Sequence, residues 1–312
     1  MKKFMSLLLC AVLLVSFTGT AYAAGTTEAA EEIDVARTDC SLTVSYSAAA
    51  DCGETLEIKL HQIAVISADF QYTLRSPYPQ VKLNGISTQS EWSAVSDTLG
   101  AYITADQIVP LQTVCTDTLG QALFTDLCPG LYYVEGCTFT SGRTTYTYAP
   151  FLVAVPELGT DGAWNYNAAA VPKHKKTTDM PDPETKEYTV VKVWKTASGA
   201  SHPGSVKVEL YKNGSFAETQ TLSAANNWMY TWTDDTDSTW TVVERDVPDG
   251  YTISVSGGYV ITIINSADST PGTDDSPRTG DTQSTRLYVL LLAASGIGLI
   301  VLALLGRRKK NE

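Results

Sequence analysis

The sequence predicts an all-β protein made of two β-sandwich domains in tandem, the first with a short helical insertion. Two observations lead to this fold class. Short runs rich in Val, Thr, Tyr and Trp alternate with turn-forming residues along most of the chain, as expected for antiparallel strands. A polar, Pro-containing linker at 174–186 separates these runs into a domain at 39–173 and a domain at 187–267.

The second domain shows the strand pattern most clearly. Turns are expected at Asn213-Gly214 and at Pro248-Asp249-Gly250, because these residues favour the backbone angles that turns require. Short strands at this spacing within about 80 residues are typical of an antiparallel sandwich. Six strands are predicted, at 188–194, 205–211, 228–232, 240–244, 251–255 and 259–265.

The first domain has a similar pattern but contains one predicted helix. Thr88 and Glu91 have the spacing of a capping box, in which two side chains satisfy backbone N–H groups at the start of a helix. Apolar residues then recur at helical spacing, and we expect them to pack in the core rather than to form a binding face. These residues are Trp92, Val95, Leu99, Tyr102 and Ile103.

The N-terminal segment has the parts of a secretion signal. Lys2 and Lys3 precede an apolar run at 4–17, and 21–23, Ala-Tyr-Ala, has the small-x-small form of a signal-peptidase site. We expect residues 1–23 to be removed as a signal peptide. Residues 24–38, rich in Ala, Glu and Thr, are expected to form a flexible leader outside the cell.

The C-terminal segment carries a second targeting pattern. A spacer at 268–286 contains the pentapeptide Ser276-Pro277-Arg278-Thr279-Gly280, and an apolar run of 19 residues at 287–305 precedes a basic tail at 306–312. The run is long enough for a transmembrane helix, and the tail favours a cytoplasmic C-terminus. An ordinary C-terminal membrane anchor is one interpretation.

The same order of segments resembles the LPXTG-type cell-wall sorting signal of Gram-positive surface proteins. Ser276 stands where Leu is usual, which leaves the class of sortase open. The resemblance implies that a sortase cleaves between Thr279 and Gly280 and joins the chain covalently to peptidoglycan. The precursor would therefore span the cytoplasmic membrane before it is anchored to the cell wall.

Composition argues against several other functions. Between residues 24 and 279 the chain has 15 basic and 32 acidic residues, a net charge of −17, which repels nucleic acid. His61, His174 and His202 are scattered, and the cysteine spacing matches no zinc motif, so neither a metal nor another cofactor is expected. The sequence contains no nucleophile elbow or phosphate loop, and we expect a protein that is not an enzyme.

The second domain closely resembles the collagen-adhesin B-type (Cna-B) domain. The resemblance covers nearly the whole domain and implies an immunoglobulin-like sandwich. Its segments are Lys192-Val193-Trp194, Pro203-Gly204-Ser205-Val206, Leu210-Tyr211-Lys212-Asn213-Gly214, Asn226-Asn227-Trp228, Val247-Pro248-Asp249-Gly250-Tyr251 and Ile263-Ile264-Asn265.

The first domain resembles the N-terminal domain of sortase-assembled pilins, through the segments at 130–135 and 150–156. The stretch at 164–173 is similar to a pilin motif that ends in Pro-Lys, here Pro172-Lys173. Ala168, Ala170 and Val171 replace the Val, Val and Tyr of that motif. The resemblance implies that Lys173 is the acceptor amine to which a sortase joins Thr279 of the next subunit. A basic linker at 173–176 without that role is the alternative.

Three polar residues of the second domain are expected in its core. Strand alternation places Lys192, Glu244 and Asn265 on the same strand faces as large apolar residues. Each alone would be unfavourable there. Desolvation lowers the pKa of a Lys and raises that of a Glu, so both can be neutral. Lys192 could then attack the Asn265 carbonyl, with Glu244 polarising it and relaying protons.

The expected product is an intramolecular isopeptide bond between Lys192 and Asn265, formed with release of ammonia, which would join the first and last strands of the domain. A buried, hydrogen-bonded trio that does not react is the alternative. The first domain departs from this pattern. Glu135 has the place of the glutamate and Asn165 or Asn167 could serve as the amide, but the expected first strand at 41–46 contains no Lys. The nearest one, Lys59, lies on the next strand, so no bond is predicted there.

Cysteine offers the first domain another kind of crosslink. Disulfides persist outside the cell, and five cysteines allow two bridges with one thiol left over. The sequence leaves the pairing open, and a bridge between Cys40 and Cys52 across the first two strands is one candidate. The five are Cys40, Cys52, Cys115, Cys128 and Cys137.

These patterns indicate a structural protein of the Gram-positive cell surface, and in particular a pilus (fimbrial) subunit. Its expected partners are a sortase, peptidoglycan and other pilin subunits, with covalent bonds to the last two. A monomeric cell-wall-anchored adhesin that binds a host surface or matrix ligand is the alternative, because it would carry the same signals and sandwich domains. An accessible acceptor at Lys173 distinguishes the pilin.

Overall fold

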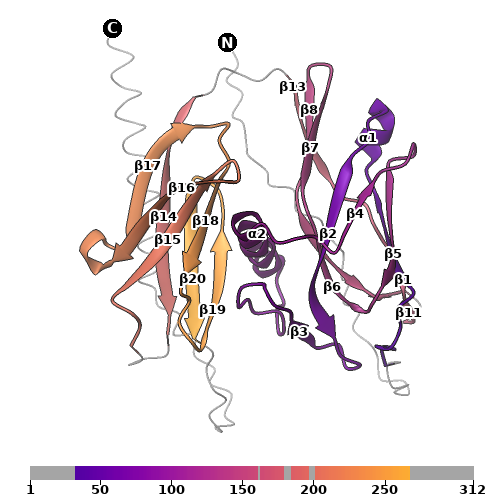
Figure 1. The fold of residues 1–312 in the computed structure, drawn as a ribbon, viewed down its shortest axis with the longest axis horizontal. Helices are drawn as coiled ribbons and strands as arrows, with labels where there is room; N and C mark the ends of the chain where they lie inside the picture. Colours follow the sequence, from indigo (N-terminus) through magenta and orange to yellow (C-terminus); the bar gives the residue numbers. More distant parts are fainter. Residues whose placement is uncertain (1–31, 161, 179–183, 197–200, 268–312) are drawn as a thin grey trace. The chain divides into compact units, whose positions relative to one another are not determined.

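The computed structural model describes residues 32–160, 162–178, 184–196 and 201–267, which lie within one compact unit. The expected signal peptide, the sorting pentapeptide and the predicted membrane span lie outside the described residues. Within the described ranges, no helix is both long and apolar enough to cross a bilayer. Most of these residues are in β-strands, as predicted (Figure 1).

The strands up to residue 178 form a first sandwich with small additional sheets. One main sheet has the order β12-β1-β5, and the other has the order β3-β2-β6-β9, with β4 also paired to β2. Two smaller sheets have the orders β13-β8-β7 and β10-β11. The strands are β1 (Cys40–Ser45), β2 (Glu57–Ile66), β3 (Tyr72–Leu74), β4 (Gln112–Cys115), β5 (Gln121–Leu127), β6 (Gly130–Val134), β7 (Cys137–Ser141), β8 (Thr144–Tyr148), β9 (Phe151–Val155), β10 (Glu157–Leu158), β11 (Trp164–Asn165), β12 (Asn167–Ala170) and β13 (His174–Thr178).

Apolar side chains from both main sheets form the core of the first sandwich. Leu42 of β1, Phe124 of β5 and Tyr132 of β6 are fully buried together. The sheet that contains β2 and β6 is also covered on its other face, where Ile63 and Tyr133 belong to a second apolar cluster that includes the long helix. Because both faces are covered, β2 is buried along most of its length rather than at alternate residues.

The predicted helix is confirmed as α2 (Gln89–Asp106). The Thr88 N–H donates to Glu91 Oε2 at 3.1 Å, and the Glu91 N–H donates to Thr88 Oγ1 at 3.3 Å, which completes the expected capping box. With 18 residues, α2 is longer than a short insertion. A Cβ at Gly100 would lie 2.5 Å from the Tyr133 hydroxyl, so glycine is what lets the helix approach the sheet.

The strands from residue 185 onward form the second sandwich. A sheet with the order β17-β14-β20-β19 faces a sheet with the order β16-β15-β18. Its strands, salmon pink to yellow in Figure 1, are β14 (Thr185–Lys195), β15 (Ser205–Lys212), β16 (Ser215–Ser223), β17 (Met229–Asp235), β18 (Trp240–Arg245), β19 (Tyr251–Ser256) and β20 (Val260–Ala267), with a 3₁₀ turn η1 (Ala224–Asn226) before β17.

In each sandwich the first strand pairs in parallel with the last strand of the two main sheets. In the first sandwich β1 pairs with β12, with Leu42 opposite Ala168. In the second, β14 pairs with β20, with Lys192 opposite Ile263. The two ends of each sandwich are thus tied to one another inside a single sheet.

The elements that the sequence did not predict individually include β16, α1 and β13. The strand β16 is mostly exposed at a sheet edge, so it lacks the apolar alternation that marks the other strands. The short helix α1 (Ser47–Cys52) directly follows β1. The strand β13 lies inside the stretch expected as a linker and pairs with β8, with His174 opposite Tyr148.

Candidate isopeptide site

Three strands from both sheets of the second sandwich bring the predicted trio together. Parallel pairing of β14 with β20 places Lys192 opposite Ile263 and Trp194 opposite Asn265, so Lys192 and Asn265 point to the same face. Glu244 comes from β18 in the facing sheet, where it pairs with Val208. The carboxylate therefore reaches across the core towards two side chains on neighbouring strands.

Glu244 is in contact with both of the other side chains. Asn265 Nδ2 donates a hydrogen bond to Glu244 Oε1 at 2.7 Å. Lys192 Nζ lies 3.3 Å from Glu244 Oε2, an ion-pair contact. Glu244 is thus shared between the amine that would attack and the amide nitrogen that would leave.

The trio is shielded from solvent. The side chains of Lys192 and Glu244 are both 0% exposed, and Asn265 is also 0% exposed. Within the described residues, Asn265 Oδ1 accepts no hydrogen bond. A buried carbonyl oxygen without a donor is unfavourable in a structural hydrogen-bond network.

Burial shifts both ionisable groups towards their neutral forms. Desolvation lowers the pKa of Lys192 to about 8, against the opposing effect of the Glu244 charge. Desolvation likewise raises the pKa of Glu244, although Lys192 and the hydrogen bond from Asn265 act in the other direction. Both shifts favour transfer of a proton from Lys192 to Glu244.

Aromatic residues border the site on the Lys192 side. Lys192 Nζ lies 4.1 Å from the centroid of the Trp194 ring. The Trp194 ring in turn stacks on His202, with centroids 4.7 Å apart and planes 6° apart. These rings fill the space beside the amine with apolar surface, which adds to the desolvation of Lys192.

The candidate residues of the first sandwich do not form an equivalent trio. Glu135 Oε1 lies 2.7 Å from Nε2 of His61, a fully buried histidine on β2. The Asn165 amide donates to Glu157 at 2.9 Å, while Lys59 is half exposed, 4.0 Å from Glu57.

Strand pairing explains this difference between the two sandwiches. In β1 the inward residues are Cys40, Leu42 and Val44, all fully buried. On the partner strand β12, Ala168 lies opposite Leu42 and Ala170 lies opposite Val44. The positions that correspond to the Lys192–Asn265 pair in the second sandwich are therefore apolar. Knowledge that β1 pairs with β12 in parallel would have located these positions in the sequence.

Lys173 lies between β12 and β13. Its side chain is exposed, whereas Pro172 before it is buried. In the part of the chain that the structure describes, no hydrogen bond or ion pair holds the Lys173 ammonium group. The amine is therefore accessible to a second protein.

All five cysteines of the first sandwich are free thiols in the structure. The candidate bridge between Cys40 and Cys52 does not fit this fold, because Cys40 begins β1 and Cys52 ends α1, which follows the other end of that strand. A strand of this length separates the two by roughly 17 Å. Cys40 instead lies opposite Leu127, next to Cys128 in the sequence.

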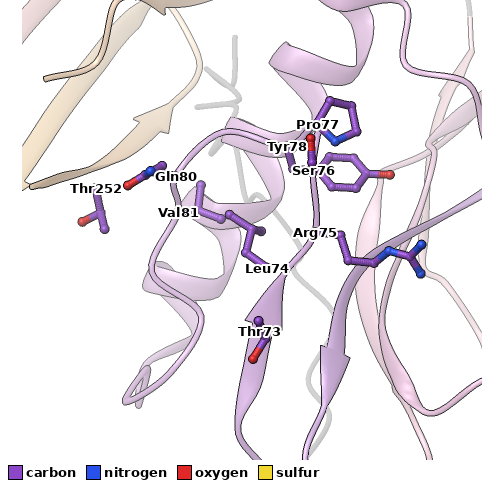
Figure 2. A pocket seen from close by; sticks show the side chains of 9 residues that line it. All are labelled: Thr73, Leu74, Arg75, Ser76, Pro77, Tyr78, Gln80, Val81 and Thr252. Carbon is purple, nitrogen blue, oxygen red and sulfur yellow. The ribbon is translucent and has the colours of Figure 1, made fainter. Parts of the chain in front are cut away.

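A groove of about 590 Å³ lies near the loop that follows β3 (Figure 2). Of its nine lining residues, Arg75 alone carries a formal charge, and its guanidinium donates a hydrogen bond to Gln62. Tyr78 lies 3.5 Å from Nδ1 of His61. Among the described residues, no three His, Cys, Asp or Glu side chains are grouped as metal ligands would be.

The second sandwich, with its buried trio, defines a class of domain. Residues 188–266 match the family described as Cna protein B-type domain, which confirms the resemblance predicted for this part of the chain. The chain is thus a mostly β protein that carries a domain of this type. Comparison with curated proteins finds no match.

Solved structures that resemble the chain include three surface or pilus proteins. A single B repeat unit of the collagen-binding surface protein Cna of Staphylococcus aureus has 15% identity, with 73% of this chain and 97% of that chain covered and a TM-score of 0.25. The shaft pilin SpaA of Lactobacillus rhamnosus GG has 15% identity, coverage of 75% and 100%, and a TM-score of 0.24. The major pilin SpaD of Corynebacterium diphtheriae has 17% identity, coverage of 75% and 65%, and a TM-score of 0.27.

Proposed function

We propose that this chain is a non-enzymatic structural subunit of a pilus on a Gram-positive cell surface, and that an isopeptide bond between Lys192 and Asn265 strengthens its second sandwich. The observation that supports this most directly is the contact of both Lys192 and Asn265 with Glu244 inside a solvent-free core. A globular core gains little from such a trio unless the three groups react, because burying them is unfavourable.

The proposed reaction uses the contacts described above. The Nζ of neutral Lys192 attacks the Asn265 Cγ, so that a Nζ–Cγ bond forms and the Cγ–Nδ2 bond breaks. Glu244 accepts the proton that Nζ loses and delivers it to Nδ2, which leaves as ammonia. Because Glu244 Oε1 contacts Nδ2 rather than the carbonyl oxygen, its role is proton transfer to the leaving group more than polarisation of the carbonyl.

Subunits would be joined by a second covalent bond. A sortase breaks the Thr279–Gly280 peptide bond and holds the Thr279 acyl group as a thioester. The Lys173 amine of the next subunit then displaces the sortase thiol and forms an amide. The exposed position of Lys173 next to buried Pro172 supports this role.

The test is polymer formation in a host that supplies the matching pilus sortase. Wall extracts of cells that express the wild-type chain should give a ladder of multimers that resists boiling in detergent, with a crosslinked peptide that joins Thr279 to Lys173. The variant Lys173→Arg should give monomer only, because the guanidinium group is a poor nucleophile. Lys175→Arg, which changes an exposed neighbour on β13, should polymerise normally.

Two results would contradict this proposal, the first for the acceptor lysine and the second for the pilin function itself. If Lys173→Arg leaves the ladder intact, another lysine is the acceptor. If the wild-type chain is anchored only as a monomer in the presence of a pilus sortase, the wall-anchored adhesin is the correct function and Lys173 belongs to a basic linker.

A further inference from the structure

The isopeptide site of the second sandwich lies next to two strand edges. Strand β18 is the last strand of its sheet, and β19 is the last strand of the other. Edge strands expose unpaired backbone groups and leave a path for water between the two sheets. Glu244 is on β18, so whatever covers the β18 and β19 edges determines how well water is excluded from the isopeptide site.

Gln80 and helix α2 accept hydrogen bonds from backbone N–H groups of β19. The Ile253 N–H donates to the Gln80 carbonyl at 2.8 Å. The Val255 N–H donates to Thr98 Oγ1 at 2.6 Å, and the Thr98 hydroxyl donates in turn to the Ala94 carbonyl within α2. Thr98 is fully buried, so this contact is not shared with solvent.

The same helix holds the strand that carries Glu244. The Tyr102 hydroxyl donates to the Glu244 backbone carbonyl at 2.5 Å. One turn further along α2, Asp106 Oδ1 lies 2.7 Å from the guanidinium of Arg245, the residue after Glu244. Burial, and to a lesser degree the charge of Glu244, raises the pKa of Tyr102, in keeping with its closeness to the carboxylate.

Apolar contacts between α2 and the edge strands also exclude water. Leu99, Tyr102 and Ile103 of α2 belong to the same buried cluster as Val242 of β18 and Val255 of β19. The sequence predicted these helix residues as core, but the core that they enter is shared with the second sandwich.

We propose that α2 completes the isopeptide site. Tyr102 and Thr98 are positioning residues that fix β18 and β19, and the helix thereby excludes water from Lys192 and Glu244. This inference rests on the isopeptide reaction proposed above. It implies an order of events: the first sandwich folds and presents α2, and only then does the Lys192–Asn265 bond form. A chain whose first sandwich is misfolded would not be crosslinked prematurely.

The experiment follows bond formation in the full secreted chain. Unreacted chain recovered from inclusion bodies in denaturant is refolded by dilution, and the loss of about 17 Da that accompanies release of ammonia is timed by intact mass spectrometry. Tyr102→Phe removes only the hydroxyl, and the rate should fall about threefold to tenfold, the effect of losing one buried hydrogen bond. Thr98→Val should act in the same direction.

The rate is also measured against pH. Water that enters beside Glu244 relieves the desolvation of Lys192, so the midpoint of the alkaline rise in rate should move upward from about 8 towards the ordinary lysine value of 10.5 in Tyr102→Phe. A variant that merely folds less well would lower the yield without moving this midpoint.

Tyr132→Phe is the matched control. Tyr132 is a buried tyrosine of the first sandwich whose hydroxyl also donates to a backbone carbonyl at 2.5 Å, that of Cys128, but it belongs to the other apolar cluster. The inference is overturned if Tyr102→Phe reacts like the wild type, or if both Phe variants slow equally with unchanged pH profiles. If the folded wild type itself loses no mass, the isopeptide reaction is wrong instead.

Discussion

Replacing Lys192 by methionine tests the covalent tie most directly. Lys192→Met removes the nucleophile but keeps a long apolar side chain, and Glu244 keeps its hydrogen bond from Asn265. Removing one partner of a buried pair is destabilising when the other partner stays charged. Burial raises the pKa of Glu244, so its carboxyl can be neutral beside the new side chain. A loss of stability that Lys192→Met shares with Asn265→Ala, which keeps Lys192 beside Glu244, therefore reports the missing crosslink.

The size of the loss follows from the loop that the bond closes. Lys192 and Asn265 enclose about 70 residues, and a crosslink of that span removes unfolded-chain entropy equivalent to about 4 kcal/mol if disulfide loops are a fair guide. In a cooperative unit of about 240 residues, each kcal/mol shifts Tm by roughly 2–4 °C, so Tm should fall by roughly 8–16 °C.

The assay combines intact mass with thermal unfolding followed by circular dichroism. The wild type should weigh about 17 Da less than its sequence, and Lys192→Met should have the full mass of its own sequence. Lys59→Met, which changes a half-exposed side chain near the start of β2, is the control and should behave like the wild type. A folded wild type with its full sequence mass, or an unchanged Tm in Lys192→Met, would refute the reasoning.

Two further predictions concern sorting and pH. Thr279→Ala should move the protein from the wall fraction to the membrane or medium, as immunoblots of cell fractions would detect; normal wall attachment would contradict the sorting signal. In Asn265→Ala, Lys192 stays unreacted, and its lowered pKa means that the folded state binds fewer protons than the unfolded state between pH 8 and 10.5. The free energy of unfolding, measured with urea, should therefore rise with pH across this window in Asn265→Ala but not in the double variant Lys192→Met/Asn265→Ala. If the two curves run parallel, the pKa of Lys192 is not lowered in the folded state.

Local patterns predicted the second sandwich and its site well. Alternation along a strand depends only on neighbouring residues, so it placed Lys192, Glu244 and Asn265 in the core before any strand order was known. The capping box of α2 is equally local, because Thr88 and Glu91 satisfy each other's backbone groups.

Features that depend on tertiary packing were missed. The exposed edge strand β16 has little apolar alternation that could mark it as a strand. The candidate disulfide between Cys40 and Cys52 does not fit because β1 and then α1 lie between the two cysteines. The contact of buried His61 with the partly exposed Glu135 joins distant parts of the chain. The stripe on α2 marks a buried face, but nothing in its spacing says that Tyr102 reaches Glu244.

Parallel pairing of the first and last strands has a mechanical consequence of its own. The chain enters β14 at Thr185 and leaves β20 at Ala267, and because these strands run in the same direction, entry and exit lie at opposite ends of the pair. Tension along a polymer would slide the two strands lengthwise, so that the whole ladder from Thr189 to Lys195 resists at once instead of opening one pair at a time. A newly secreted subunit would thus already withstand stretching during the interval before its Lys192–Asn265 bond has formed.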